Sequence, residues 1–237
     1  MLPPEIPAPV VDRFWRGVVS ENGRCHDHAI IPGGCVDVVY KQAGSRVRCL
    51  VFGTTTRMRF FRINPDATYV GTRFRPGMAR HLLGDFPEEL RDRHLEVQGS
   101  LGLTSDQVAD APTFSAHGAL PARTIIGALR RREVVPTSLD QAIGHVQHNR
   151  DPWRVESLAA MCGVSTRQLE KTTVGLPPKL LMRILRAQAA ITAMQRGPFG
   201  LLVDLAAALG YSDQAHMNRD VRVLTGTTPS HYRIALV

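Results

Sequence analysis

Apolar residues follow two different spacings along the chain. From Ala29 to Arg75 they alternate with polar residues as in β-strands, and Gly, Pro and Asn separate the alternating runs. We therefore predict a small antiparallel sheet with one face exposed to water. Its strands are expected at residues 30–31, 36–40, 47–51, 57–63 and 68–74.

Beyond Pro76-Gly77 the apolar spacing becomes helical. A short helix is expected to end near Gly84, and Pro87 suits the first turn of another. Two further helices are expected at residues 105–109 and 121–132. The first part of the chain, residues 1–133, is therefore predicted to be an α+β domain.

Two similar stretches dominate the last third of the chain, at residues 158–165 and 205–212. Each predicts a helix, a glycine turn (Gly163, Gly210) and a second helix. Ser165 and Ser212 are suitable N-caps for the two second helices. This arrangement is typical of a helix-turn-helix, whose second helix can enter a DNA major groove.

Between these stretches, residues 179–195 carry apolar side chains at helical spacing. The 17 residues predict a rod about 25 Å long at 1.5 Å per residue. Two recognition helices at its ends could then lie about one DNA turn, ~34 Å, apart. We predict an all-α domain over residues 134–237, with two helix-turn-helix motifs joined by a central helix.

The segment from about Leu139 to Arg233 resembles the DNA-binding domain of the AraC/XylS family of bacterial transcription regulators. The resemblance is most specific in the run 205–233, and above all in Thr225-Gly226-Thr227-Thr228-Pro229 with Tyr232-Arg233. Only Thr172-Thr173 lie between Lys171 and Val174, where family members usually have about one more helical turn. The first recognition helix is therefore expected to be short.

The resemblance implies a transcription regulator, not an enzyme, that binds double-stranded DNA and acts on RNA polymerase. Activation is the working expectation, and repression stays open. Eight candidate DNA-contacting residues follow from helix faces and from the family's positions: Thr166, Arg167, Glu170, Lys171, Lys179, Gln214, His216 and Arg219. Arg, Lys and Gln can bond to base edges or phosphates. The alternative for each is an ordinary solvated charged face.

Residues 31–40 and 70–77 resemble an uncharacterised domain that often precedes this DNA-binding module. That resemblance implies sensing of a small-molecule effector or homodimerisation. Arg73 and Arg75 share a sheet face and are the candidates for an anionic ligand, with a solvated sheet face as the commoner alternative.

An enzyme with cysteine chemistry in the first domain is the alternative function. Cys35 lies in Gly34-Cys35-Val36, but it leads an apolar strand, which favours a buried structural thiol. The run Cys25-His26-Asp27-His28 contains metal-ligand types without a closed zinc spacing. We therefore expect no catalytic residue, no metal and no cofactor.

The net charge of +8 favours a polyanionic partner only loosely. Residues from 140 onward hold 11 Lys and Arg against seven Asp and Glu, and the rest holds 18 against 14. The excess is therefore equal in the two parts, and the helical motif carries the DNA-binding prediction. No apolar run approaches a membrane span and no secretory pattern opens the chain, so a cytoplasmic, nucleoid-associated protein is expected.

Overall fold

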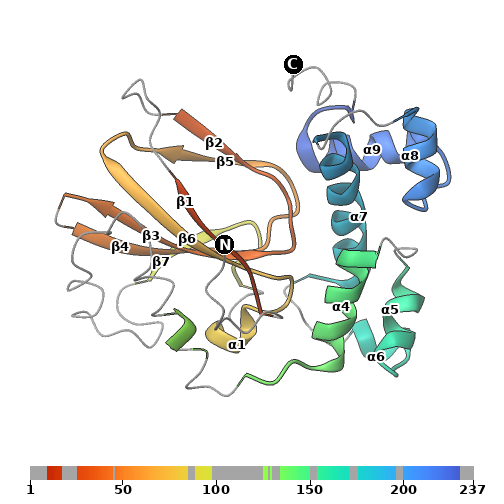
Figure 1. Ribbon diagram of the computed structural model, residues 1–237, viewed down its shortest axis with the longest axis horizontal. Coiled ribbons are helices and arrows are strands. Elements are labelled where there is room, and N and C mark those ends of the chain that lie inside the picture. The colour runs from red at the N-terminus through yellow and green to blue at the C-terminus, as the bar shows by residue number, and fades with distance from the viewer. Residues whose placement is uncertain are drawn as a thin grey trace.

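The computed structural model describes residues 10–17, 26–44, 46–84, 89–97, 125–127, 129, 134–149, 154–170, 176–195 and 200–229. An antiparallel-sheet region comes first and a helical region follows, as predicted (Figure 1). The five-stranded sheet has the order β1-β6-β3-β4-β7, and β2 pairs with β5 in a second, two-stranded sheet. The strands are β1 Val11–Gly17, β2 His26–Ile30, β3 Val36–Ala43, β4 Arg46–Phe52, β5 Arg59–Ile63, β6 Ala67–Phe74 and β7 His94–Val97.

Both faces of the larger sheet are covered, so the expectation of one exposed face was wrong. One face packs against α1 (Arg80–Leu83) and the helical residues 125–127 and 129. The other face packs against Phe61 and Ile63 of β5, which belongs to the two-stranded sheet. Val38 and Val39, which are neighbours in β3, are both buried because they point to opposite, covered faces.

A helix beginning at Pro87 was also expected, and this was wrong within the described residues. Residues 89–92 form turns, and His94–Val97 is the edge strand β7, antiparallel to β4. The backbone groups of β4 would otherwise lack partners on this side, and pairing with β7 satisfies them. The short helix before Gly84 is confirmed, whereas the predicted helix at 105–109 and the start of the one at 121–132 lie outside the described residues.

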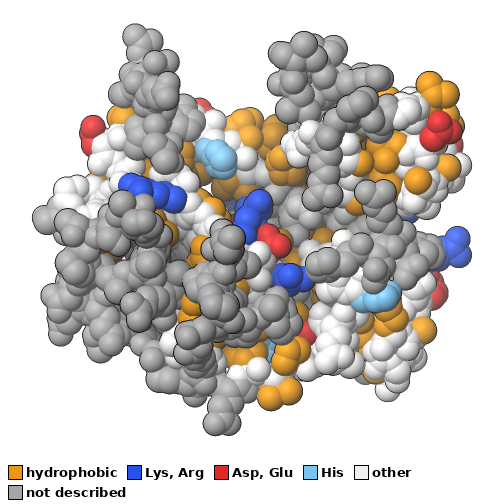
Figure 2. Space-filling model, viewed as in Figure 1, with side chains coloured by type: hydrophobic (Ala, Val, Ile, Leu, Met, Phe, Trp, Pro, Cys, Tyr) orange, Lys and Arg blue, Asp and Glu red, His pale blue; other side chains and the backbone are white. Residues whose placement is uncertain are grey.

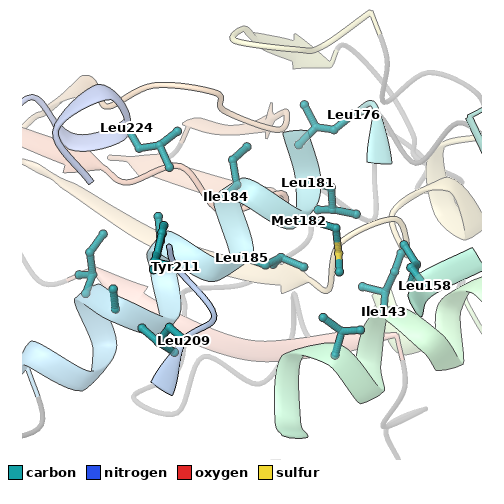
Figure 3. Packing of buried hydrophobic residues seen from close by; sticks show 14 of the residues in the cluster. Ile143, Leu158, Leu176, Leu181, Met182, Ile184, Leu185, Leu209, Tyr211 and Leu224 are labelled. Carbon is teal, nitrogen blue, oxygen red and sulfur yellow. The ribbon is translucent and has the colours of Figure 1, made fainter. Parts of the chain in front are cut away.

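The helical region is arranged around one long helix, α7 (Pro178–Gln195). Helices α4 (Ser138–Asn149), α5 (Val155–Met161) and α6 (Thr166–Glu170) surround one end of it, and α8 (Leu202–Ala208) and α9 (Gln214–Thr225) surround the other (Figure 1). Leu181, Ile184 and Leu185 of α7 form the middle of a continuous apolar core (Figure 3). That core links Ile143 and Leu158 at one end with Leu209 and Leu224 at the other.

Candidate nucleic-acid interface and adjoining cavity

The first helix pair is α5 and α6, joined by a turn in which Gly163 has φ +67°. Ser165 caps α6 as predicted, because its Oγ accepts a hydrogen bond from Gln168 N–H at 3.2 Å. Gln168 Oε1 in turn accepts from Ser165 N–H at 2.8 Å, which completes a capping box. Leu169 faces the core, so the rest of this short helix is free to face outward.

The candidate residues of the first pair are exposed. Thr166, Arg167 and Glu170 all lie on the solvent side of α6. Lys171 lies outside the described residues. The residues that follow Glu170 up to residue 175 also lie outside the described part of the chain, so the expected short first recognition helix stays a prediction.

The second helix pair is α8 and α9, joined by a turn in which Gly210 has φ +71°. The cap of α9 is Asp213 and not Ser212, because the helix begins one residue later than expected. Asp213 Oδ1 accepts from His216 N–H at 2.6 Å, and this bond lowers the pKa of the Asp213 carboxyl. Ser212 Oγ instead bonds to Asp213 and to His216 Nδ1.

The outward face of α9 carries Arg219, which is exposed, and Gln214 and His216, which are half-buried. The His216 ring packs edge-on against Tyr211, with 5.2 Å between ring centroids. Lys179 is exposed at the start of α7. The described Lys and Arg side chains are scattered over the face seen in Figure 2 and form no single basic patch there.

Asp220 lies on the inward face of α9 and is 4% exposed. Its Oδ1 accepts from Arg183 Nε of α7 at 2.7 Å. This ion pair joins residues 37 apart in sequence and gives Arg183 a protein partner.

A cavity of about 580 Å³ lies where the two sheets meet the last turns of α7. Aromatic side chains from the sheets (Trp15, Phe52, Phe61 and Tyr69) form part of its wall. Polar side chains of α7 (Gln188, Thr192 and Gln195) close the opposite side. Sequence reasoning missed this cavity, because its walls come from elements whose mutual packing no local pattern encodes.

Arg73, one of the two candidates for an anionic ligand, lines the cavity but already has a carboxylate partner. Its guanidinium donates to both oxygens of Asp37 at 3.0–3.2 Å, and Trp15 Nε1 donates to Asp37 Oδ1 at 3.0 Å. Arg75 does not line the cavity. Two further arginines, Arg13 and Arg16, do line it, so positive side chains outnumber Asp37 there.

Cys35 and Cys49 are poorly suited to act as nucleophiles. Burial raises the pKa of Cys35 to about 12, and it raises the pKa of Cys49 to about 12 as well. A thiol with such a pKa is almost wholly protonated near neutral pH, so it lacks the thiolate that cysteine chemistry needs. Within the described residues, no three His, Cys, Asp or Glu side chains gather as metal ligands do, and no helix could cross a membrane.

Hydrogen bonds and an ion pair join the sheet region to the helices. Arg80 and His81 of the α1 segment both bond to Asp140 of α4, the latter with 3.1 Å between His81 Nε2 and Asp140 Oδ2. Met58 N–H donates to Leu224 O near the end of α9 at 2.7 Å. Of these contacts, none could be predicted from the sequence; only the local Thr137–Asp140 capping box beside them has a recognisable spacing.

Gly34, in the turn before β3, lies against α7. It has φ +62°, and a Cβ there would come within 2.7 Å of Leu181 Cδ1. At Gly33 a Cβ would meet Gln188 Nε2 at 3.0 Å. The two glycines therefore let the chain approach the central helix closely.

Two family models match the chain. One, described as a domain of unknown function (DUF6597), covers residues 1–96, and the other, described as a helix-turn-helix domain, covers residues 158–235. The second match includes α6 to α9. No curated protein matches the chain.

Solved structures of transcription regulators are similar to parts or all of the chain. A regulator with an AraC-type DNA-binding domain from Chromobacterium violaceum is 27% identical, with a TM-score of 0.38, over 42% of this chain and 92% of that one. ToxT from Vibrio cholerae is 10% identical, with a TM-score of 0.44, over 95% of this chain and 98% of that one. ToxT with a bound unsaturated fatty acid gives the same identity and TM-score, over 93% and 95%.

Proposed function

We propose that the chain is a DNA-binding transcription regulator that reads two major-groove segments of one operator through the helix-turn-helix domain matched at residues 158–235. The supporting observation is the placement of α5–α6 and α8–α9 at opposite ends of α7 (Figure 1). In each pair the second helix begins at a side-chain cap and presents polar residues to solvent. Such a helix suits insertion in a major groove.

The residues divide by expected role. Arg167 and Gln214 lie in the first turns of α6 and α9, where base edges are read, and Arg219 follows on the outward face of α9. Lys179 is a phosphate contact on this proposal, as is Lys171. Thr166, Glu170 and His216 lie beside these residues and complete the two faces. The His216 ring is held by Ser212 Oγ at Nδ1, by Tyr211 and, with Nε2 3.8 Å from Oδ2, by Asp220.

Selection of bound DNA from a random pool tests this proposal. The recovered motif should have two conserved segments about one helical turn apart. With about six phosphates neutralised, log K should fall against log salt with a slope near −5. Recovery of no motif, together with a slope near zero, would overturn it.

We further propose that the cavity between the sheets and α7 binds a small-molecule effector. Its aromatic wall suits an apolar body, and the excess of arginine over Asp37 suits an anionic end. Because α7 lines the cavity and also joins the two helix pairs, a ligand there touches the DNA-binding region directly. ToxT has been seen with a fatty acid, which is in line with an effector of this kind.

A thermal-shift screen with small carboxylic acids that carry an aromatic or aliphatic group tests the effector proposal. A bound ligand raises the apparent stability of the protein. Thr192→Trp should fill the cavity from its α7 side and abolish the shift. Ala160→Trp, at an exposed position of α5, serves as the control and should keep it. A shift that survives Thr192→Trp would place the ligand elsewhere.

The remaining expectations also stand as proposals: division into domains at 133/134, homodimerisation, activation through RNA polymerase, and a cytoplasmic, nucleoid-associated location. A fragment of residues 134–237 should fold and protect operator DNA if the division is right. The contacts at Asp140 and Leu224 predict that this fragment is less stable than the same residues in the full chain. An unfolded fragment beside a stable full chain would refute the division.

A further inference from the structure

Asp220 is a buried carboxylate on a helix whose other inward-facing side chains are mostly apolar. Met217, Val221 and Leu224 form the inward stripe of α9 and are nearly inaccessible to water. Asp220 faces inward beside them, with its side chain 5% exposed. Burying a carboxylate costs several kcal/mol unless partners compensate for the lost water.

The main partners are two arginines of the central helix, and His216 Nε2 of α9 itself lies 3.8 Å from Asp220 Oδ2. Arg183 Nε donates to Asp220 Oδ1 at 2.7 Å, and Arg186 Nη2 lies 3.5 Å from Asp220 Oδ2. Arg183 and Arg186 are three residues apart on α7 and therefore lie on one face of it. The carboxylate of α9 is thus held between two successive turns of α7.

Arg186 also holds the turn that precedes α9. Its guanidinium lies over the Tyr211 ring, 4.1 Å from the centroid, and donates to Gly210 O at 3.3 Å. Tyr211 is buried and packs against His216 of the first turn of α9. One side chain of α7 therefore contacts both the turn and, through Asp220, the second helix of the pair.

This set of contacts fixes how α9 is rotated about its own axis. An apolar stripe on a helix tolerates some rotation, because dispersion contacts are individually weak and undirected. A carboxylate held by charged donors from a second helix is directional. Arg219 precedes Asp220 by one residue, about 100° around the helix, so any rotation that breaks the ion pairs also moves Arg219.

We propose that Asp220, held by Arg183 and Arg186, is a positioning residue that sets the DNA-sequence specificity of α9. The inference rests on the proposed function, in which α9 lies in a major groove. Apolar residues could hold the helix equally firmly, since a buried ion pair is often no more stabilising than a packed apolar pair. What the ion pairs add is a defined rotation of the outward residues.

The proposal predicts that specificity and general affinity separate. In Asp220→Asn the side-chain shape stays and the charge is lost, so the arginines no longer hold α9 in one rotation. Binding to the selected operator should weaken by about 5- to 150-fold, the range for one base contact. Binding to scrambled DNA should stay equal or become tighter, because Arg183 and Arg186 lose a neutralising carboxylate and their charges favour phosphate.

The experiment compares the full-length wild type with Asp220→Asn on selected and scrambled DNA at fixed salt, with thermal unfolding measured alongside. The matched control is Asp204→Asn, which changes an exposed carboxylate in the first turn of α8. It should leave the ratio of operator affinity to scrambled-DNA affinity unchanged. Equal weakening on both DNAs, or a ratio within twofold of wild type, would overturn the positioning role. Failure of the wild type to prefer any sequence would instead overturn the proposed function.

A second variant covers the case in which Asp220→Asn does not fold. Arg183→Gln leaves the carboxylate in contact with Arg186, and Arg183 is itself 37% exposed, so folding should survive. If Arg183 acts through Asp220, its loss should lower the operator-to-scrambled ratio, and Arg183→Lys should restore part of it. An equal loss on all DNA would make Arg183 a phosphate contact and overturn the proposal.

Discussion

Replacing Asp140 by alanine should loosen the junction between the sheet region and the helices. Asp140 is the third residue of α4, and its side chain has no exposed surface. It accepts from Thr137 N–H at 2.8 Å, which makes a capping box, and it also bonds to Arg80 and His81. One carboxylate thus takes part in the cap of α4 in the helical region and also bonds to two side chains of the sheet region, Arg80 and His81.

The size of the effect follows from these two roles. Loss of a helix cap costs about 1 kcal/mol. Breaking a buried ion pair costs roughly 3–5 kcal/mol. The Arg80 side chain is 22% exposed and can turn toward water, so the cost of breaking its ion pair lies at the lower end of that range. We expect Asp140→Ala to lower the free energy of unfolding by about 3–4 kcal/mol, with cap and ion-pair losses partly overlapping.

Urea unfolding followed by far-ultraviolet circular dichroism measures this change. Glu156→Ala removes an exposed carboxylate from the first turn of α5 and should change the free energy of unfolding by no more than about 0.5 kcal/mol. Combining Asp140→Ala with Arg80→Ala should give a smaller loss than the sum of the single losses. Additive effects, or an Asp140→Ala loss no larger than that of the control, would show that the junction does not depend on this carboxylate.

Three further predictions concern pH, DNA binding and thiol reactivity. Burial alone would raise the pKa of Asp140, but the Thr137 hydrogen bond and the Arg80 charge lower it below 3.8. The stabilisation is therefore present above that value and lost as pH falls through the folded-state pKa; acid titration of Asp140→Asn should lack this loss. Arg219→Ala should weaken operator binding more than Arg167→Ala, because only Thr172-Thr173 separate Lys171 from Val174-Gly175 and the first recognition helix is expected to be short. Gel-shift titration on matched and scrambled DNA tests this, and a larger loss for Arg167→Ala would contradict it. Iodoacetamide at neutral pH should leave Cys35 and Cys49 unmodified in the folded protein, as peptide mapping can show, and rapid labelling of either would contradict their raised pKa.

Local patterns in the sequence predicted the helical region well. Apolar spacing located α7, and the glycines Gly163, Gly210 and Gly226 all have the positive φ that helix ends and turns require. These features depend on neighbours within a few residues, so they can be read without knowing the fold. The cap of α9 was misplaced by one residue because Ser212 and Asp213 are both good caps and only the helix start decides between them.

Features that depend on distant partners could not be read in this way. The strand β7 pairs with the edge of β4, and the alternation of polar and apolar residues at 94–97 is only four residues long, too short to predict a strand by itself. The cavity requires the two sheets and α7 to meet, and the double role of Asp140 requires α1 to approach α4. Each joins residues far apart in sequence, whose pairing is set by tertiary packing.

The glycine turn at Gly33 and Gly34 limits how this regulator can be recombined. Its close approach to Leu181 and Gln188 means that the first region is shaped to one particular central helix. A chimera that joins residues 1–133 to another helix-turn-helix module should assemble only if small or flexible side chains occupy those two positions of the new helix. Exchange of the first region between such proteins would therefore have to include the matching face of the central helix.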